Sequence, residues 1–205
     1  MMMMQAKTIR VTFVALVLML LSTTALASNF SGQRGVPTIL DKLVATDGAQ
    51  ALVAAVLVVD GAGALPFSLA ELLGDKREEV VLLAPTNTAF ENLLGLEPGT
   101  LDGLTIGEIE GELPALLPPG VGVDEVAAIL LKHAALPRKA NRFTASERAL
   151  LAKGEIEVAD ESVFPVSVGN AGVRINYETS IVEPNLFVRN GVIHFIDTVI
   201  TDSQD

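Results

Sequence analysis

The chain has 205 residues, with 14 Lys or Arg against 25 Asp or Glu and a formal net charge of −11. A surface this acidic repels phosphate backbones, which makes nucleic acid an unfavourable partner. The sequence contains no cysteine, so disulfides and thiol catalysis are excluded. With 50% hydrophobic but only 4% aromatic residues, the core must be aliphatic, and the stacking platforms of sugar-binding clefts are missing.

The N-terminus has the pattern of a cleavable signal peptide. Lys7 and Arg10 precede an apolar run over residues 11–21, and Ala25 and Ala27 form a small-x-small cleavage site before Ser28. The run has 11 residues, well short of the ~20 of a membrane-spanning helix. We therefore expect residues 1–27 to be removed during export. The remaining 178 residues carry a net charge of −13, from 12 basic and 25 acidic residues, and suffice for one domain.

The first part of the mature chain is predicted to be helical. A polar leader over residues 28–35 is followed by helices with apolar residues at helical spacing. Their predicted starts are Pro37 with Thr38, then Asp47 with Gln50 as a capping box, then Ser68 with Glu71. The second helix is expected to end at the loop over residues 60–63.

A buried strand is predicted next. Val80 to Leu83 form a continuous apolar run that Pro85 ends. The segment 84–90 is then a strand-to-helix corner, where a Thr or Asn oxygen can cap exposed backbone amides.

Residues 95–123 are rich in Gly and Pro and are predicted to form short helical turns in a long surface excursion, a candidate contact surface. Asp124 is predicted to cap a further helix. Its apolar face would carry Val126, Ile129 and Leu130, with His133 on the same face.

The last part changes to strands. From Gly154 onward we expect short β runs over residues 156–158, 163–168, 173–177 and 181–182. Asn190-Gly191 lies between two apolar runs and predicts a hairpin with a type I′ turn. Residues 202–205 form an acidic tail.

Three segments in this order resemble the signatures of the fasciclin-like domain family: Val80–Leu94 (VVLLAPTNTAFENLL), Ile129–Leu136 (ILLKHAAL) and Asn190–Ile200 (NGVIHFIDTVI). The resemblance covers residues 36–201. It implies an α+β fold, a wedge-shaped β-sandwich with helices packed along one edge. It also implies an extracellular or periplasmic adhesion module without an established catalytic centre.

Two departures from the family pattern affect the site that the resemblance implies. The family commonly has Tyr-His where this chain has Lys132-His133, and the excursion after the first signature is longer. In animal members the Tyr-His region is linked to integrin recognition, but the prokaryotic look of this signal peptide gives no reason to expect integrins. The resemblance thus implies a binding segment that includes Lys132, His133, Leu136, Arg138 and Lys139.

A hydrolase would have to use His133 or His194 in an open cleft beside a Ser, Thr or carboxylate, and burial of both would rule this out. No nucleophile-elbow, zinc-helix or phosphate-loop motif is present, so we expect no catalytic residue and no cofactor. Several acidic residues offer oxygen ligands without EF-hand spacing, so no dedicated metal site is expected. These residues are Asp102, Glu108, Glu110, Glu112, Asp160 and Glu161.

The sequence therefore predicts a secreted or periplasmic, non-catalytic module that binds a protein or polysaccharide of the matrix, envelope or cell surface through exposed loops and a sandwich edge. The alternative is a periplasmic carrier of a small apolar or lipid ligand, with residues 95–123 covering a pocket. The partner and the oligomeric state stay open.

Overall fold

The computed structural model describes residues 35–136, 147–169 and 172–201. The predicted signal peptide over 1–27, the leader up to residue 34, Arg138, Lys139 and the acidic tail 202–205 lie outside these residues. The chain divides into two units, Met1–Gly35 and Val36–Asp205, and the following concerns the second. The helices are α1 Ile39–Val44, α2 Gln50–Ala62, α3 Leu69–Gly74, α4 Asn87–Leu94, α5 Ile106–Leu116, α6 Val123–Leu131 and α7 Glu147–Lys153. The strands are β1 Val80–Pro85, β2 Ala134–Ala135, β3 Glu155–Glu157, β4 Val163–Gly169, β5 Gly172–Ile175, β6 Thr179–Val188 and β7 Gly191–Ile196.

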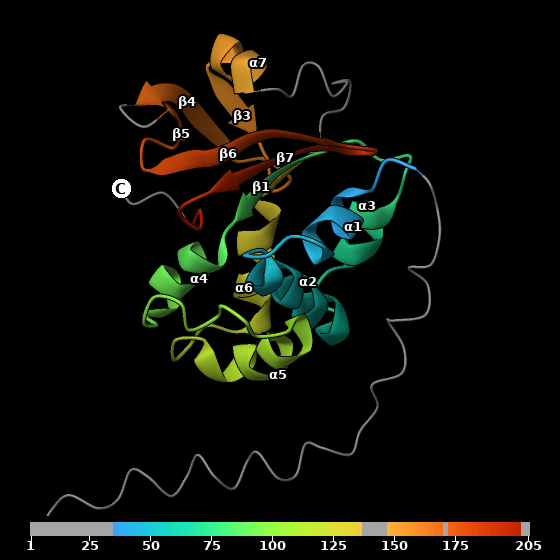
Figure 1. The fold of residues 1–205 in the computed structure, drawn as a ribbon, viewed down its shortest axis with the longest axis vertical. Helices are drawn as coiled ribbons and strands as arrows, with labels where there is room; N and C mark the ends of the chain where they lie inside the picture. The colour runs from blue at the N-terminus through green and yellow to red at the C-terminus, as the bar shows by residue number, and fades with distance from the viewer. Residues whose placement is uncertain (1–34, 137–146, 170–171, 202–205) are drawn as a thin grey trace, which may run out of the picture. The chain divides into compact units, whose positions relative to one another are not determined.

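The strands form one mixed sheet in the order β2-β1-β7-β6-β5-β4-β3 (Figure 1). β1 and β7 are parallel, and the other neighbours are antiparallel. Three strand spacings separate β7 from β4, about 14 Å in a flat sheet. Yet Phe164 and Val166 of β4 belong to the same core as Val192 of β7 and Val81 of β1. The sheet therefore curls over this core, and the predicted α+β class is confirmed.

The two central strands are buried on both faces. Along β1, Val80 and Leu82 join the core shared with helices α1 to α6, whereas Val81 and Leu83 join the core inside the curled sheet. Because both faces of β1 are buried, the strand has no polar residue and its sequence is a continuous apolar run.

Side-chain caps start the three helices α1, α3 and α4 where the sequence predicts them. Thr38 forms a capping box with Asp41, Ser68 caps α3, and Thr86 accepts a hydrogen bond from the Ala89 amide at 3.3 Å. These caps satisfy amides that have no partner within the helix.

The start predicted for α2 is wrong in its mechanism. The helix has Ala49 at its N-cap, and no side chain of its own first turn caps it. Instead, Asn87 reaches across from α4, and its Oδ1 accepts from the Ala51 amide at 3.1 Å. Gln50 supports this contact, because its Oε1 accepts from the Asn87 amide group at 2.9 Å.

The excursion over residues 95–123 is more ordered than short turns. It contains α5, an 11-residue helix that begins at a capping box of Thr105 and Glu108. Ile109 and Leu113 are buried in the helix-facing core, where α5 packs against α2. Burial of these two side chains overrides the low helix propensity of Gly and Pro.

The next predicted helix is shifted by one or two residues. α6 is capped at Gly122 rather than Asp124, and it ends at Leu131. The short elements β2 and α7 were not predicted.

The predicted hairpin is present, but its turn type is wrong. Val188 pairs with Gly191, so the two loop residues are Arg189 and Asn190. Asn190 is not among the non-glycine residues with positive φ in the described part of the chain, which a type I′ turn would require. The side chain of Asn190 points into the core instead, as described below.

The predicted strand over 173–177 ends early. β5 stops at Ile175, and Asn176 and Tyr177 both have positive φ, at 51° and 62°. They form the turn to β6. Within the described residues, no helix is both long and apolar enough to cross a membrane.

Candidate functional site

The second signature forms the junction between α6 and the sheet. The Lys132 and His133 amides donate to carbonyls of the last turn of α6, and the His133 carbonyl accepts from the Leu83 amide of β1 at 2.8 Å. Ala134 and Ala135 then pair with β1 as β2. This path turns the His133 side chain inward, where it is 1% exposed.

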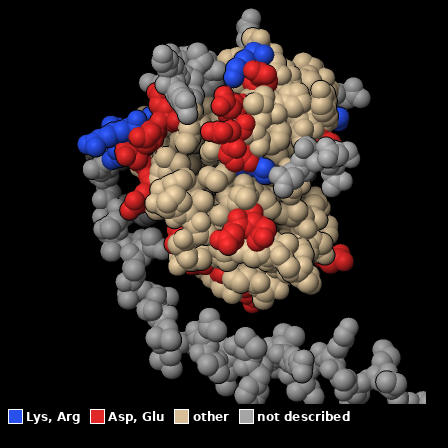
Figure 2. All heavy atoms as spheres, turned by 180° about the vertical axis from the view of Figure 1, so that it is seen from behind, with Lys and Arg blue, Asp and Glu red and all other residues tan. Residues whose placement is uncertain are grey.

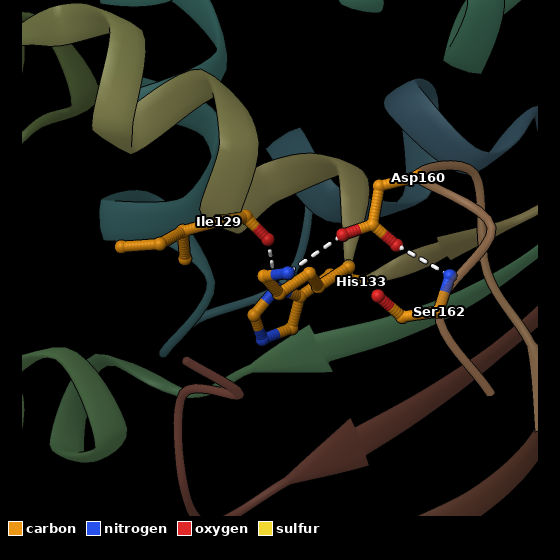
Figure 3. Close-up of polar contacts among 5 residues, drawn as sticks. Ile129, His133, Asp160 and Ser162 are labelled. Atoms are coloured by element: carbon orange, nitrogen blue, oxygen red, sulfur yellow. Dashed lines mark hydrogen bonds and ion pairs between the residues drawn. The ribbon is translucent and has the colours of Figure 1, made fainter. Parts of the chain in front are cut away.

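Both ring nitrogens of His133 are used inside the protein. Nδ1 lies 2.7 Å from the Ile129 carbonyl oxygen and donates to it (Figure 3), while Nε2 accepts from the Ile200 amide at 2.9 Å. The neutral ring therefore links α6 to the segment after β7. Burial lowers the pKa of His133 to about 4; the Ile129 hydrogen bond opposes this shift and the charge of Lys132 adds to it.

Lys132 is also mostly buried, and it forms an ion pair. Its Nζ lies 2.6 Å from Asp160 Oδ2, while Asp160 Oδ1 accepts from the Ser162 amide at 3.0 Å (Figure 3). Desolvation raises the pKa of Asp160. The hydrogen bonds from Lys132 and Ser162, together with the positive charge of Lys132, outweigh desolvation, so the pKa of Asp160 lies below its usual value. This pair fastens α6 to the turn between β3 and β4.

The predicted binding segment is thus mainly a structural junction in its first half. The side chains of Lys132 and His133 are turned inward, so they hold neighbouring residues in place and do not offer a contact surface themselves. Leu136 is 42% exposed and accessible. Arg138 and Lys139 lie outside the described residues, and their binding role stays a prediction.

The third signature contributes a buried anchor that the sequence analysis missed. Asn190 is 1% exposed, and its Oδ1 accepts from the Ile39 amide at 2.8 Å. Its Nδ2 donates to the carbonyls of Leu73 and Asp75, at 3.0 and 2.9 Å. One side chain thereby joins α1, the end of α3 and the β6–β7 turn.

Gly191 completes this anchor. A Cβ at this position would overlap the Val80 carbonyl oxygen, and its φ of 153° is one that side chains rarely adopt. The Asn-Gly pair therefore reflects long-range contacts with β1 and α3 rather than a local turn preference.

The first signature contains a second hidden anchor. Glu91 is 1% exposed, and its two carboxylate oxygens accept from the Gly99 and Leu101 amides at 2.9 and 2.8 Å. It fixes the loop after α4. A signal in the sequence is the spacing of Glu91, which lies three residues before Leu94, a residue that packs against the helix-facing core; the two side chains therefore share one face of α4.

Neither histidine meets the requirement of an open cleft. His194 is fully buried in β7, and its Nδ1 accepts from the Asn185 amide at 3.3 Å. His133 is committed to Ile129 and Ile200, as above. In the part of the chain that the structure describes, no three His, Asp or Glu side chains gather closely enough to hold a metal ion.

Exposed large apolar side chains occur on both the helical part and the strand region of the described residues. The helix-facing core takes buried residues from β1, β2, β6 and β7, but none from β3, β4 or β5. One face of these three strands is consequently left to solvent. Exposed large apolar residues of this region are Val163, Val168, Tyr177, Val182 and Phe187.

A bulge in β6 adds to this exposed region. The pairing with β7 shifts register between Ile181 and Leu186, and Asn185 has a φ of 63°. Within this irregular stretch, Glu183 and Pro184 are exposed. Bulges of this kind re-aim side chains and are common beside functional surfaces.

Comparisons with known proteins agree with this geometry. The sequence model described as "Fasciclin domain" matches residues 67–202. Among solved structures, the chain is similar to a FAS1 domain pair from the insect cell adhesion molecule fasciclin I, with a TM-score of 0.56 and 15% sequence identity. The match covers 81% of this chain and 51% of that one, so the chain spans about half of the domain pair. Comparison with curated proteins gives no match.

The family match covers most of the chain and contains the first and third signatures and the His133 junction, and the structural likeness shows the same fold. The chain therefore belongs to the fasciclin domain family.

Proposed function

We propose that this protein is a non-catalytic interaction module that works outside the cytoplasm, either in the periplasm or after secretion. It binds a protein or polysaccharide of the cell envelope, matrix or cell surface. The export part of this proposal comes from the basic, apolar and small-x-small pattern over residues 1–27.

The observation that carries the binding part is a contrast between buried polar side chains and exposed apolar ones. Both histidines, His133 and His194, and the carboxylate of Glu91 are buried and hydrogen-bonded within the fold. By contrast, the strand region presents apolar side chains to solvent, as binding surfaces do. Family membership supports the same reading, since the structurally similar fasciclin I is a cell adhesion molecule.

The packing of α5 weighs against the carrier alternative. That hypothesis places a ligand behind residues 95–123, where Ile109 and Leu113 fill the space against α2. A carrier would need these side chains to move apart.

The proposal is tested by immobilising the purified full chain and exposing it to envelope and matrix fractions. Molecules that co-purify with the chain are extracted and analysed in parallel. Saturable retention of a protein or polysaccharide is the expected result. A stoichiometric small apolar molecule, with no macromolecule retained, would replace the proposal with the carrier.

The same experiment tests the predicted binding segment. Leu136, Arg138 and Lys139 are changed to Ser, with Lys132 and His133 left intact because their removal would disturb the junction. Weaker retention would assign the contact to this segment, whereas unchanged retention would place it elsewhere on the surface.

A further inference from the structure

The turn between β5 and β6 holds an aromatic residue in a strained conformation. Tyr177, the one tyrosine of the chain, has a φ of 62° and directly follows Asn176 at 51°. Asn adopts left-handed φ readily, but a bulky aromatic residue does so rarely and at a cost. Conformations of this kind persist only where surrounding contacts impose them, and they concentrate at functional sites.

Backbone contacts impose this conformation. The Asn176 amide donates to the Pro165 carbonyl at 2.9 Å, and Arg174 Nη1 donates to the Tyr177 carbonyl at 3.3 Å. The Glu178 amide closes the turn on the Asn176 carbonyl at 2.7 Å. The turn is therefore fixed against β4 through its backbone, without help from the tyrosine ring.

The ring itself is not used in the core. Tyr177 is 67% exposed, and Val163 at the same end of β4 is 52% exposed. The strain thus stabilises no buried packing; it keeps an aromatic side chain in solvent at the end of the sheet. Exposed Tyr residues on rigid supports are typical central contacts of protein interfaces.

The described residues at this end of the sheet carry mostly negative charges. The antiparallel pairing of β3, β4 and β5 brings the turns 158–162 and 176–178 to the same end as Val163. Exposed carboxylates there belong to Glu157, Glu161 and Glu178. Among the described residues, the basic groups nearby are Lys132, paired with Asp160, and Arg174, bonded to the Tyr177 carbonyl.

We define the acidic sheet end as Glu157, Glu161, Val163, Tyr177 and Glu178. In Figure 2, acidic side chains gather on the upper part of the visible face, with basic side chains at the upper and lower ends of this group. Carboxylates beside an aromatic face suit ammonium and guanidinium groups, which bind the carboxylates by charge-assisted hydrogen bonds and the ring by cation–π contact. Anionic partners would be repelled.

We propose that the acidic sheet end binds a lysine- and arginine-rich polypeptide segment of the partner, with Tyr177 as the central contact. This inference rests on the proposed function, because it names the partner class of the interaction module.

The test uses the purified full chain and two probes, 20-residue poly-L-lysine and poly-L-arginine, with poly-L-glutamate as the negative probe. Binding is measured by calorimetry at several salt concentrations, because any acidic protein attracts polycations to some degree. Tyr177→Asn keeps a residue that accepts positive φ and removes the ring. We expect it to weaken binding about tenfold, on the scale of a central interface contact, without lowering the melting temperature.

Two control variants separate the acidic sheet end from general acidity. Phe67→Asn removes an aromatic side chain that is 45% exposed in the loop before α3. The triple variant Glu157→Gln, Glu161→Gln and Glu178→Gln is compared with Asp102→Asn, Glu112→Gln and Asp124→Asn on the helical part. Tyr177→Phe, which keeps the ring, should bind as the unaltered chain does.

The inference is supported if the variants of the acidic sheet end bind polycations more weakly and the control variants of the helical part change the affinity by less than about twofold. Equal losses in both sets, or unchanged binding by Tyr177→Asn, would overturn it. The pull-down then distinguishes the two proposals. If Tyr177→Asn retains the envelope or matrix partner as well as the unaltered chain does, only this inference fails. If neither chain retains a macromolecule, the proposed function itself fails.

Discussion

Two regions of this domain treat their special residues in opposite ways. At the junction around Asn190 and His133, each side-chain donor or acceptor described above has a partner within the fold, and the side chains are buried. At the acidic sheet end, Tyr177 is held in a strained backbone but leaves its ring in solvent. The buried residues of the family signatures therefore build the frame, and we propose that contact with a partner falls mainly to residues outside them.

The comparison predicts that the frame is the more fragile region. The largest effect is expected for Gly191→Ala, because a Cβ there would overlap the Val80 carbonyl oxygen and the strand pairing would have to shift. We expect a loss of at least about 4 kcal/mol in the free energy of unfolding, measured with urea. Gly107→Ala is the control, since a Cβ on that α5 residue meets no atom within 4 Å. It should be neutral or stabilising, and a comparable loss there would contradict this reason.

Asn190→Ala should follow in size. It removes three hydrogen bonds and leaves the Ile39 amide and the Leu73 carbonyl without that partner in a buried place. The expected cost is about 3 to 4 kcal/mol by urea unfolding. Asn92→Ala in α4, where the side chain is exposed, should change the stability by less than about 0.5 kcal/mol. If the two variants were equally stable, Asn190 would not be the anchor.

The pH dependence of stability should reveal His133. Its pKa falls from 6.5 to about 4 on folding, so the unfolded chain binds more protons between these values. The His133 contribution is therefore fully present above pH 6.5 and is lost as the pH falls towards 4. The whole contribution is on the order of 3 kcal/mol.

The measurement is urea unfolding at half-unit steps from pH 7 to pH 4, with His133→Gln as the comparison. The variant should be less stable at pH 7 and show a flatter curve over this window. The depressed pKa of Asp160 acts separately, because its contribution is lost only below the usual carboxylate range. Parallel curves for the two proteins would show that His133 does not titrate as inferred.

A smaller effect is expected at Glu91. Glu91→Gln replaces one of two carboxylate oxygens that accept from the Gly99 and Leu101 amides, so one buried amide loses its acceptor. The expected loss is about 2 kcal/mol. Glu112→Gln, at an exposed position of α5, should be close to neutral. A neutral result at Glu91 would mean that the loop after α4 does not depend on it.

The sequence was sufficient where a local rule decides the structure. Thr38, Ser68 and Thr86 cap helices at the predicted places because a cap needs only its own first turn. The apolar run over residues 80–83 likewise predicted a buried strand, and all residues of β1 are buried.

Prediction failed where distant residues decide. The cap of α2 comes from Asn87, 36 positions from Ala51, and Asn190 reaches Ile39 across 151 positions. Local spacing carries no sign of such contacts. The same reason explains why Lys132 was placed on a binding surface, since only the junction between α6, β2 and β1 shows that it points inward. The apolar face of the predicted helix did indicate that His133 faces the core. Tyr177 was assigned to a strand because an aromatic residue has high strand propensity.

The most direct test of the division between frame and contact surface is amide hydrogen exchange on the full chain, with and without its retained partner. Protection confined to residues 155–163 and 174–182 is the expected result. Exchange at the Ile39 and Ile200 amides, which are bonded to Asn190 and His133, should be slow in both states. Protection that appears instead on α5, with none at the acidic sheet end, would contradict it.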